Sequence, residues 1–184
     1  LPQGFSDAAV VDEEGREVPS AIRDGRIEFE AWAPALGFSA YRILEKPFSG
    51  ETNISVSEAC LENDYYRIML DENGNLTGIY DKRNECEVLE QGRPSNLLQI
   101  FEDKPYCETA WNIDLEYQNK YWNLTEGKVE VIEESPVKGV VRVTKKFNLS
   151  EIVQDITIYR SVPRIDFRTI VNWQETEKML KAAF

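Results

Sequence analysis

Histidine is absent from all 184 residues of this chain. It is the commonest metal ligand in proteins and the side chain best suited to moving protons near neutral pH. Without it, the chain cannot hold a Ser-His or Cys-His nucleophile system of its own. We therefore expect this chain to contain no catalytic residues and no metal site, and to bind no cofactor by itself.

Positive charge and long hydrophobic runs are also scarce. The chain has 21 Lys and Arg against 33 Asp and Glu, which gives a net charge of −12. Nucleic acids and anionic membrane surfaces both need a basic patch, so the composition argues against either as a partner. No apolar run approaches the roughly 20 residues that a membrane-spanning helix needs. We interpret the acidic surplus as a contribution to solubility.

Cysteine is limited to Cys60, Cys86 and Cys107, an odd number without CxxC spacing. This pattern is typical of an intracellular protein whose thiols are unpaired and mostly buried. The sequence therefore predicts a cytoplasmic location.

The sequence does contain a succession of short strand patterns separated by turn residues. The clearest of them lie at 26–33, 54–59, 140–147, 152–159 and 164–173. Alternation of apolar and polar residues, with little helical periodicity elsewhere, favours an antiparallel arrangement. Only residues 175–183 look helical. The predicted fold class is therefore all-β, an antiparallel β-sandwich.

Residues 61–82 predict a hairpin. Tyr66, Ile68 and Leu70 alternate with Tyr65, Arg67 and Met69, and the segment 71–75 (DENGN) supplies residues that tolerate positive φ. Tyr66 is expected to face the core.

The strand at 164–173 divides into two faces and is expected to pair with the strand before it. Ile165, Phe167 and Val171 fall on one side, whereas Asp166 and Arg168 fall on the other. This pattern is typical of a sheet with one solvated face, and it places Phe167 in the core.

A cluster of Pro, Gly and Ser at residues 46–51 predicts a boundary. We expect residues 1–48 to form the end of a small β-domain and residues 49–184 to form the first part of a large β-sandwich domain. Neither end of the sequence looks like a natural domain limit, so we expect the chain to be a piece of a longer protein.

Residues 101–114 form a segment rich in acids and aromatics directly after a strand. Asp103, Tyr106 and Trp111 are the candidate ligand-binding residues, because aromatic rings and carboxylates together suit contact with a sugar. In the alternative interpretation, Trp111 fills a gap between sheets and Asp103 accepts hydrogen bonds from loop amides. Glycoside hydrolysis needs two carboxyl groups at a fixed separation, which the sequence of this loop cannot show.

Several segments have a recognisable order and spacing. Residues 10–19 read VVDEEGREVP, residues 29–38 read FEAWAPALGF, and residues 180–184 read LKAAF. Together with the hairpin at 61–82 and the segment at 96–114, they resemble the C-terminal β-sandwich region of glycoside hydrolase family 38, the α-mannosidases. The cytosolic and bacterial branch of that family is the most similar.

Two positions depart from the family pattern. Relatives tend to carry Asp-Ala-Trp-Asp where this chain has TAWN at residues 109–112, and Asp-Trp-His-Glu where it has NWQE at residues 172–175. We therefore do not expect an acid–base role for these positions.

The resemblance implies a fragment of a supersandwich of the galactose-mutarotase-like type. It also implies a parent enzyme that hydrolyses α-mannosidic bonds with retention, using an Asp nucleophile and a zinc-type divalent ion in an N-terminal catalytic domain that is absent here. This chain would then act as a non-catalytic scaffold whose partner is that catalytic domain. Asp103, Tyr106 and Trp111 would help to wall the cleft in which the whole enzyme binds mannose-containing glycans.

An alternative from another functional class stays open. The chain could be a stand-alone carbohydrate-binding or adhesin-like β-sandwich module. The flanking coding sequence would distinguish the two, because a preceding catalytic domain indicates the enzyme and a signal peptide indicates the module.

Overall fold

The computed structural model describes residues 7–108 and 111–184. Within them the chain forms 17 β-strands and one short 3₁₀ helix, η1 (Leu115–Asn119), and the strands make five antiparallel sheets. The predicted all-β class is therefore confirmed. In this part of the chain no helix is long and apolar enough to cross a membrane.

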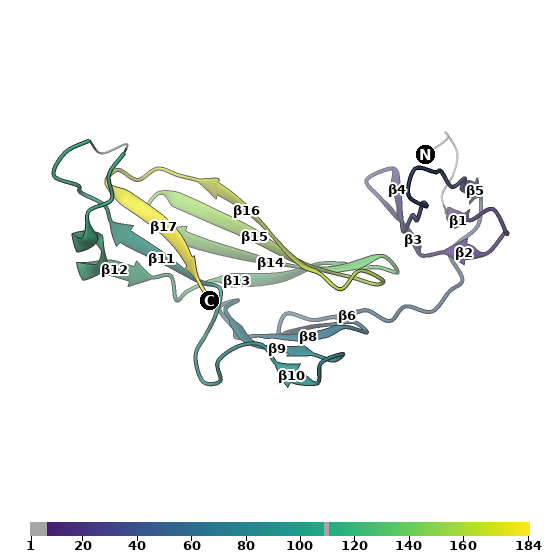
Figure 1. Cartoon of the computed structure of the whole chain (residues 1–184), viewed down its shortest axis with the longest axis horizontal. Helices are drawn as coiled ribbons and strands as arrows, with labels where there is room; N and C mark the ends of the chain where they lie inside the picture. The colour runs from purple at the N-terminus through teal and green to yellow at the C-terminus, as the bar shows by residue number, and fades with distance from the viewer. Residues whose placement is uncertain (1–6, 109–110) are drawn as a thin grey trace.

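The N-terminal part holds two small sheets, seen at one end of the molecule in Figure 1. One has the order β2-β1-β5 and the other is the hairpin β3-β4. Their strands are β1 (Ala9–Val11), β2 (Glu17–Val18), β3 (Ser20–Arg23), β4 (Arg26–Phe29) and β5 (Arg42–Leu44). Residues 45–54 then run without a strand to the larger part of the chain.

The larger part holds three sheets, with the orders β10-β9-β8-β7-β6, β12-β11-β17 and β13-β14-β15-β16. The strands of the first are β6 (Ser55–Val56), β7 (Cys60–Glu62), β8 (Tyr66–Leu70), β9 (Leu76–Asp81) and β10 (Cys86–Glu87). Those of the second are β11 (Leu97–Glu102), β12 (Tyr121–Asn123) and β17 (Lys178–Ala183). Those of the third are β13 (Lys128–Glu134), β14 (Lys138–Phe147), β15 (Ser150–Tyr159) and β16 (Ile165–Asn172).

The sheet β13–β16 is the long layer of the sandwich. The sheets β10-β9-β8-β7-β6 and β12-β11-β17 form the other layer and cover different parts of one of its faces (Figure 1). Two apolar clusters fill the space between the layers. The cluster beneath β6–β10 contains Leu61, Ile68, Leu70, Leu76, Ile79, Val141, Val143, Ile156 and Ile158. The cluster beneath β11 and β17 contains Leu98, Ile100, Leu124 and Ile152, with Phe147, Trp173 and Leu180 packed against it.

The hairpin predicted at 61–82 is present as β8 and β9. Its turn has Gly74 at a φ of +76°, and Asp71 Oδ1 accepts the backbone N–H groups of Asn73 and Asn75, both at 2.9 Å. Tyr66 is half-buried against the larger apolar cluster, on the face that the alternation predicts. The turn residues thus act through their side chains as well as through their backbone freedom.

The amine of Lys145 lies inside the sandwich. Lys145 Nζ donates to Asn75 Oδ1 at 2.6 Å and to the carbonyl of Leu124 at 2.8 Å. Burial lowers the pKa of Lys145, because the charged form loses its hydration. This amine therefore links β14 to the β8–β9 turn and to the chain that follows β12.

The predicted pairing of the strands at 152–159 and 164–173 is confirmed by β15 and β16. Phe167 pairs with Ile156 and packs against the larger apolar cluster, but it is only half-buried. Val171, predicted on the same face, is exposed. The reason is that β16 is the last strand of its sheet in the described part of the chain, so only β15 covers its side.

Three local expectations were wrong. The segment 175–183, which looks helical, contains the strand β17, because pairing with β11 and packing of Leu180 outweigh local propensity. The strands expected at 26–33 and 54–59 are shorter, and only Arg26–Phe29 and Ser55–Val56 are paired.

The thiols also differ from expectation. Cys86 and Cys107 are exposed and Cys60 is half-buried, so the thiols are not mostly buried.

The small N-terminal sheets join the sandwich through polar contacts. Arg23 on β3 pairs with Glu133, and Lys138 pairs with Glu28 on β4. The predicted division between residues 48 and 49 falls in the strand-free connection, and the independence of the two parts stays a prediction.

Candidate functional site

The segment 101–114 begins on β11 and leaves the edge of the sandwich between β11 and η1. Its first residues are held by β17 and its flanks. The backbone N–H of Asp103 donates to the carbonyl of Glu177 at 2.9 Å, and Lys104 pairs with the Glu177 carboxylate at 3.1 Å. Lys120, just before β12, pairs with Glu102 at 3.1 Å. The base of the loop is therefore fixed to a rigid sheet.

Asp103 lies at this base and lines a depression of about 400 Å³ together with Pro105, Asp114 and Tyr117. Its Oδ1 atom is buried and has no hydrogen-bond partner within the described residues. Asp103 therefore does not satisfy loop amides through this atom, contrary to the alternative interpretation. A buried acceptor without a donor from the protein is costly.

Tyr106 and Trp111 extend away from the sandwich. Tyr106 is 99% exposed and Trp111 is 87% exposed. The backbone N–H of Tyr106 donates to Asp114 Oδ2 at 2.7 Å, and that of Trp111 donates to the carbonyl of Glu108 at 2.7 Å. Trp111 therefore does not fill a gap between sheets. Thr109 and Ala110, which precede it, lie outside the described residues.

The three predicted residues share one loop but do not converge on one cavity. Asp103 lines the depression at the base, whereas neither Tyr106 nor Trp111 contributes to its lining, as far as the chain is described. The two rings stand in solvent beyond it. Their exposure suits contact with another molecule or domain better than a closed pocket.

A second aromatic group lies beside the loop on the outer face of sheet β12-β11-β17. Lys181 Nζ lies 5.1 Å from the ring centre of Phe101 and 4.7 Å from that of Tyr117. It donates to the Tyr117 hydroxyl at 2.8 Å, and this hydrogen bond lowers the pKa of Tyr117. Tyr121 stacks on Phe101 with ring centres 5.2 Å apart.

No sequence pattern placed Lys181 in this group. Lys181 is distant in sequence and reaches the rings only because β17 pairs with β11. No local pattern could have identified it.

The site offers little acid–base or metal chemistry. The Lys120 hydrogen bond holds the pKa of Glu102 below its ordinary value, so this carboxylate is ionised and unsuited to the general-acid role in glycoside hydrolysis. Across residues 7–108 and 111–184 no three metal-ligating side chains gather into a group. The arrangement can present aromatic rings and carboxylate acceptors, which is binding chemistry.

Comparison with known proteins agrees with the resemblance seen in the sequence. Residues 61–184 match the family described as "Glycosyl hydrolases family 38 C-terminal domain". The chain is 29% identical over 137 residues to "Alpha-mannosidase G" of Dictyostelium discoideum, covering 71% of this chain. It is also 29% identical over 141 residues to human "Alpha-mannosidase 2C1", covering 73% of this chain. In both cases it spans only 13% of the relative's length.

Solved structures share the fold. An α-mannosidase from Enterococcus faecalis V583 superposes with a TM-score of 0.66 at 16% identity, covering 97% of this chain and 26% of that protein. A second family 38 protein from Enterococcus faecalis gives a TM-score of 0.65 at 14% identity. The family match covers well over half of the chain, and the fold and the curated relatives agree with it. This chain therefore belongs to the family of glycosyl hydrolase family 38 C-terminal domains.

Proposed function

We propose that this chain is the non-catalytic β-sandwich scaffold of an α-mannosidase and that its loop 101–114 forms part of the wall of the sugar cleft. The family match supports the first half of this proposal, and the names of the relatives supply the activity. The whole enzyme would hydrolyse α-mannosidic bonds with retention of configuration. Its partners would be the chain's own catalytic domain and mannose-containing glycans.

The observation that carries the proposal is the exposure of Tyr106 and Trp111 on a loop anchored to a rigid sheet. Large aromatic rings lower their free energy by leaving water, and no part of the described sandwich covers these two. A neighbouring domain that presents bound sugar would cover both rings.

The nucleophile and the divalent ion would belong to the part of the enzyme outside this chain. The chain has no histidine, and its described side chains do not gather into a metal-ligating group. These residues therefore do not fit a zinc site. A retaining glycosidase also needs two carboxyl groups at a fixed separation across the scissile bond, and we assign neither to this chain.

We further propose a cytoplasmic location. Cys86 and Cys107 are exposed thiols without a disulfide partner. Such thiols persist most readily in a reducing compartment. The much greater length of the relatives favours the enzyme over a stand-alone carbohydrate-binding module.

The cleft proposal is tested by Trp111→Ala in the full-length enzyme. We expect kcat/KM for p-nitrophenyl α-mannoside to fall about tenfold, equivalent to about 1.4 kcal/mol, with an unchanged melting temperature. Val88→Ala, which truncates an exposed apolar side chain outside the loop, is the control and should change neither quantity. A large loss of melting temperature in Trp111→Ala with unchanged kcat/KM would show a packing role and contradict the proposal.

A further inference from the structure

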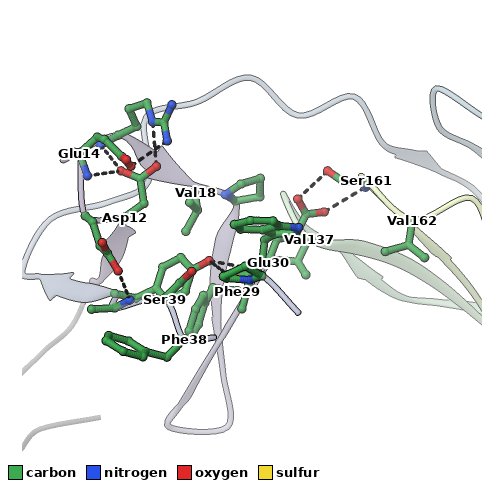
Figure 2. A pocket seen from close by; sticks show the side chains of 18 of the residues that line it. Asp12, Glu14, Val18, Phe29, Glu30, Phe38, Ser39, Val137, Ser161 and Val162 are labelled. Atoms are coloured by element: carbon green, nitrogen blue, oxygen red, sulfur yellow. Dashed lines mark hydrogen bonds and ion pairs between the residues drawn. The ribbon is translucent and has the colours of Figure 1, made fainter. Parts of the chain in front are cut away.

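A second cavity lies at the other end of the molecule, between the small N-terminal sheets and the turns of the long sheet. Figure 2 shows it, with Phe29 and Glu30 facing Val137, Ser161 and Val162 across the junction. Its volume is about 850 Å³, within the roughly 300–1,000 Å³ of small-molecule sites. Cavities at junctions between structural parts are preferred places for ligands.

Aromatic rings make up one wall and the rim of this cavity. Phe29 and Tyr41 pack with ring centres 5.2 Å apart. The Tyr41 hydroxyl accepts the backbone N–H of Trp32 at 2.7 Å and donates to the Trp32 carbonyl at 2.8 Å, which fixes the backbone that carries the indole. The side chains at the rim remain in water, with Trp32 71% and Phe38 85% exposed. The rim therefore offers exposed aromatic rings, and hydrogen bonds fix the backbone that carries Trp32.

Carboxylates line the rest of the cavity. Glu13 Oε1 accepts the backbone N–H of Ala40 at 2.7 Å. Glu30 accepts the backbone N–H of Ser161 at 3.0 Å and its hydroxyl at 2.6 Å, so it also ties β4 to the β15–β16 turn. An ionised carboxylate has about four acceptor positions and no donor. Both groups are oriented by the protein and keep acceptor capacity for a ligand.

The charges of the lining exclude an anionic ligand. Arg16 is already paired with Asp12 and Glu14, both at 2.8 Å. Arg164 is paired with Asp166 at 2.8 Å. The free acceptors therefore outnumber the free cations, and a ligand must supply hydrogen-bond donors.

We propose that this cavity binds a neutral pyranose ring of a glycan. Such a ring has an apolar face that can lie on Trp32 or Phe38, and its hydroxyls can donate to Glu13 and Glu30. Amphipathic ligands of this kind match a pocket with aromatic walls and a few oriented polar groups. The cavity is distinct from the loop 101–114, so the inference does not rest on the proposed function.

The test is an NMR titration of the 184-residue chain with methyl α-mannopyranoside and methyl α-glucopyranoside. We expect at least one of them to shift the Trp32 indole N–H signal with a Kd on the order of 1 mM. Trp32→Ala, which also identifies that signal, should weaken binding about tenfold, and Glu13→Gln about threefold. Leu36→Ala is the matched control, because Leu36 is an exposed residue of the same segment outside the cavity lining.

Two results would overturn the inference. One is the absence of binding by both sugars up to tens of millimolar. The other is binding of a lysine-rich peptide at the Trp32 signal without binding of either sugar, which would identify the cavity as a contact for a cationic protein segment. Neither measurement uses enzyme activity. A failure of the cavity proposal is therefore distinguishable from a failure of the proposed α-mannosidase function.

Discussion

At the scale of single residues, Lys145 shows how a polar group is kept inside this sandwich. Its charge loses hydration on burial, and the cost is offset by the hydrogen bonds that it donates to Asn75 and to the carbonyl of Leu124. Those two acceptors are held by different segments of the chain. The amine therefore determines how closely these segments approach β14.

Lys145→Met is expected to lower the free energy of unfolding by about 1–3 kcal/mol, because it leaves two buried acceptors without donors. Urea denaturation measures the change. Lys146→Met on the same strand is the control. The Lys146 side chain is 75% exposed, and its loss should change stability by no more than about 0.5 kcal/mol. If Lys145→Met were as stable as the unsubstituted chain, the hydrogen bonds would not exceed the cost of burying the charge.

The sequence predicted correctly which face of a strand a side chain occupies, but it did not predict how deeply that side chain is buried. In the strand pattern at 140–147, Val141, Val143 and Lys145 occupy alternate positions, and all three are buried. The same rule placed Phe167 and Val171 together, yet one is half-buried and the other is exposed. Alternation gives the face of a strand, whereas depth depends on how many strands lie beside it.

At the scale of elements, the β8–β9 turn depends on Gly74 for two separate reasons. Its φ of +76° disfavours side chains. A Cβ at this position would also lie 2.4 Å from Val143 Cγ1. The turn therefore packs directly onto β14.

Gly74→Ala is expected to destabilise the chain by about 2–4 kcal/mol, the sum of backbone strain and overpacking. Gly92→Ala is a matched control. Gly92 has a φ of +80° but no atom within 4 Å of the added Cβ, so only about 1 kcal/mol of backbone strain is expected. Chemical denaturation of the two variants separates the cost of overpacking from that of backbone strain. Equal losses would mean that Val143 moves aside without cost.

Elements that depend on turn-forming residues nearby in the sequence were predictable. Strands that pair with a partner far away in the sequence were not. The turn of the β8–β9 hairpin was predictable because Asp71, Asn73, Gly74 and Asn75 each favour a turn locally. Strand β17 was expected to be helical, since its local sequence is rich in Lys, Leu, Met and Ala. Its partner β11 lies far away in the sequence, where no local pattern reveals the pairing.

At the scale of the whole molecule, ionised carboxylates that are paired with donors stabilise the fold in both parts of the chain. Hydrogen bonds from Lys46 and then Ser49 lower the pKa of Glu17 to about 2. Hydrogen bonds from Arg67 and then Lys82 lower the pKa of Glu62 to about 2. Glu17 anchors the connection between the two parts, and Glu62 lies in the sandwich.

We expect the chain to lose stability as the pH falls from 4.5, the ordinary pKa of glutamate, to about 2. A carboxylate with a lowered folded-state pKa stabilises the fold above its unfolded pKa, and the contribution disappears as it becomes protonated. Urea midpoints measured across this range test the expectation. Glu62→Gln should be destabilising at neutral pH and converge with the unsubstituted chain near pH 2. A difference that stays constant with pH would contradict it.

The sequence was most informative about the whole molecule where motifs span many residues, as the family match over 61–184 confirms. It gave no indication of the junction cavity. Trp32 and Glu13 are far from Ser161 in sequence, and only the docking of the small sheets brings them around one space. The sugar-binding role of Asp103, Tyr106 and Trp111 stays a prediction that the experiment on Trp111 addresses.

The order of strands in sheet β12-β11-β17 has a consequence for how the chain is made. Synthesis proceeds from the N-terminus at about 5–20 residues per second. Leu98 and Ile100 leave the ribosome several seconds before Leu180, which packs against their cluster. During that interval β11 has an open edge on the side that β17 later occupies, and open edges promote aggregation. Among the five sheets of the described residues, this one is completed last during translation, so the edge of β11 stays open longest.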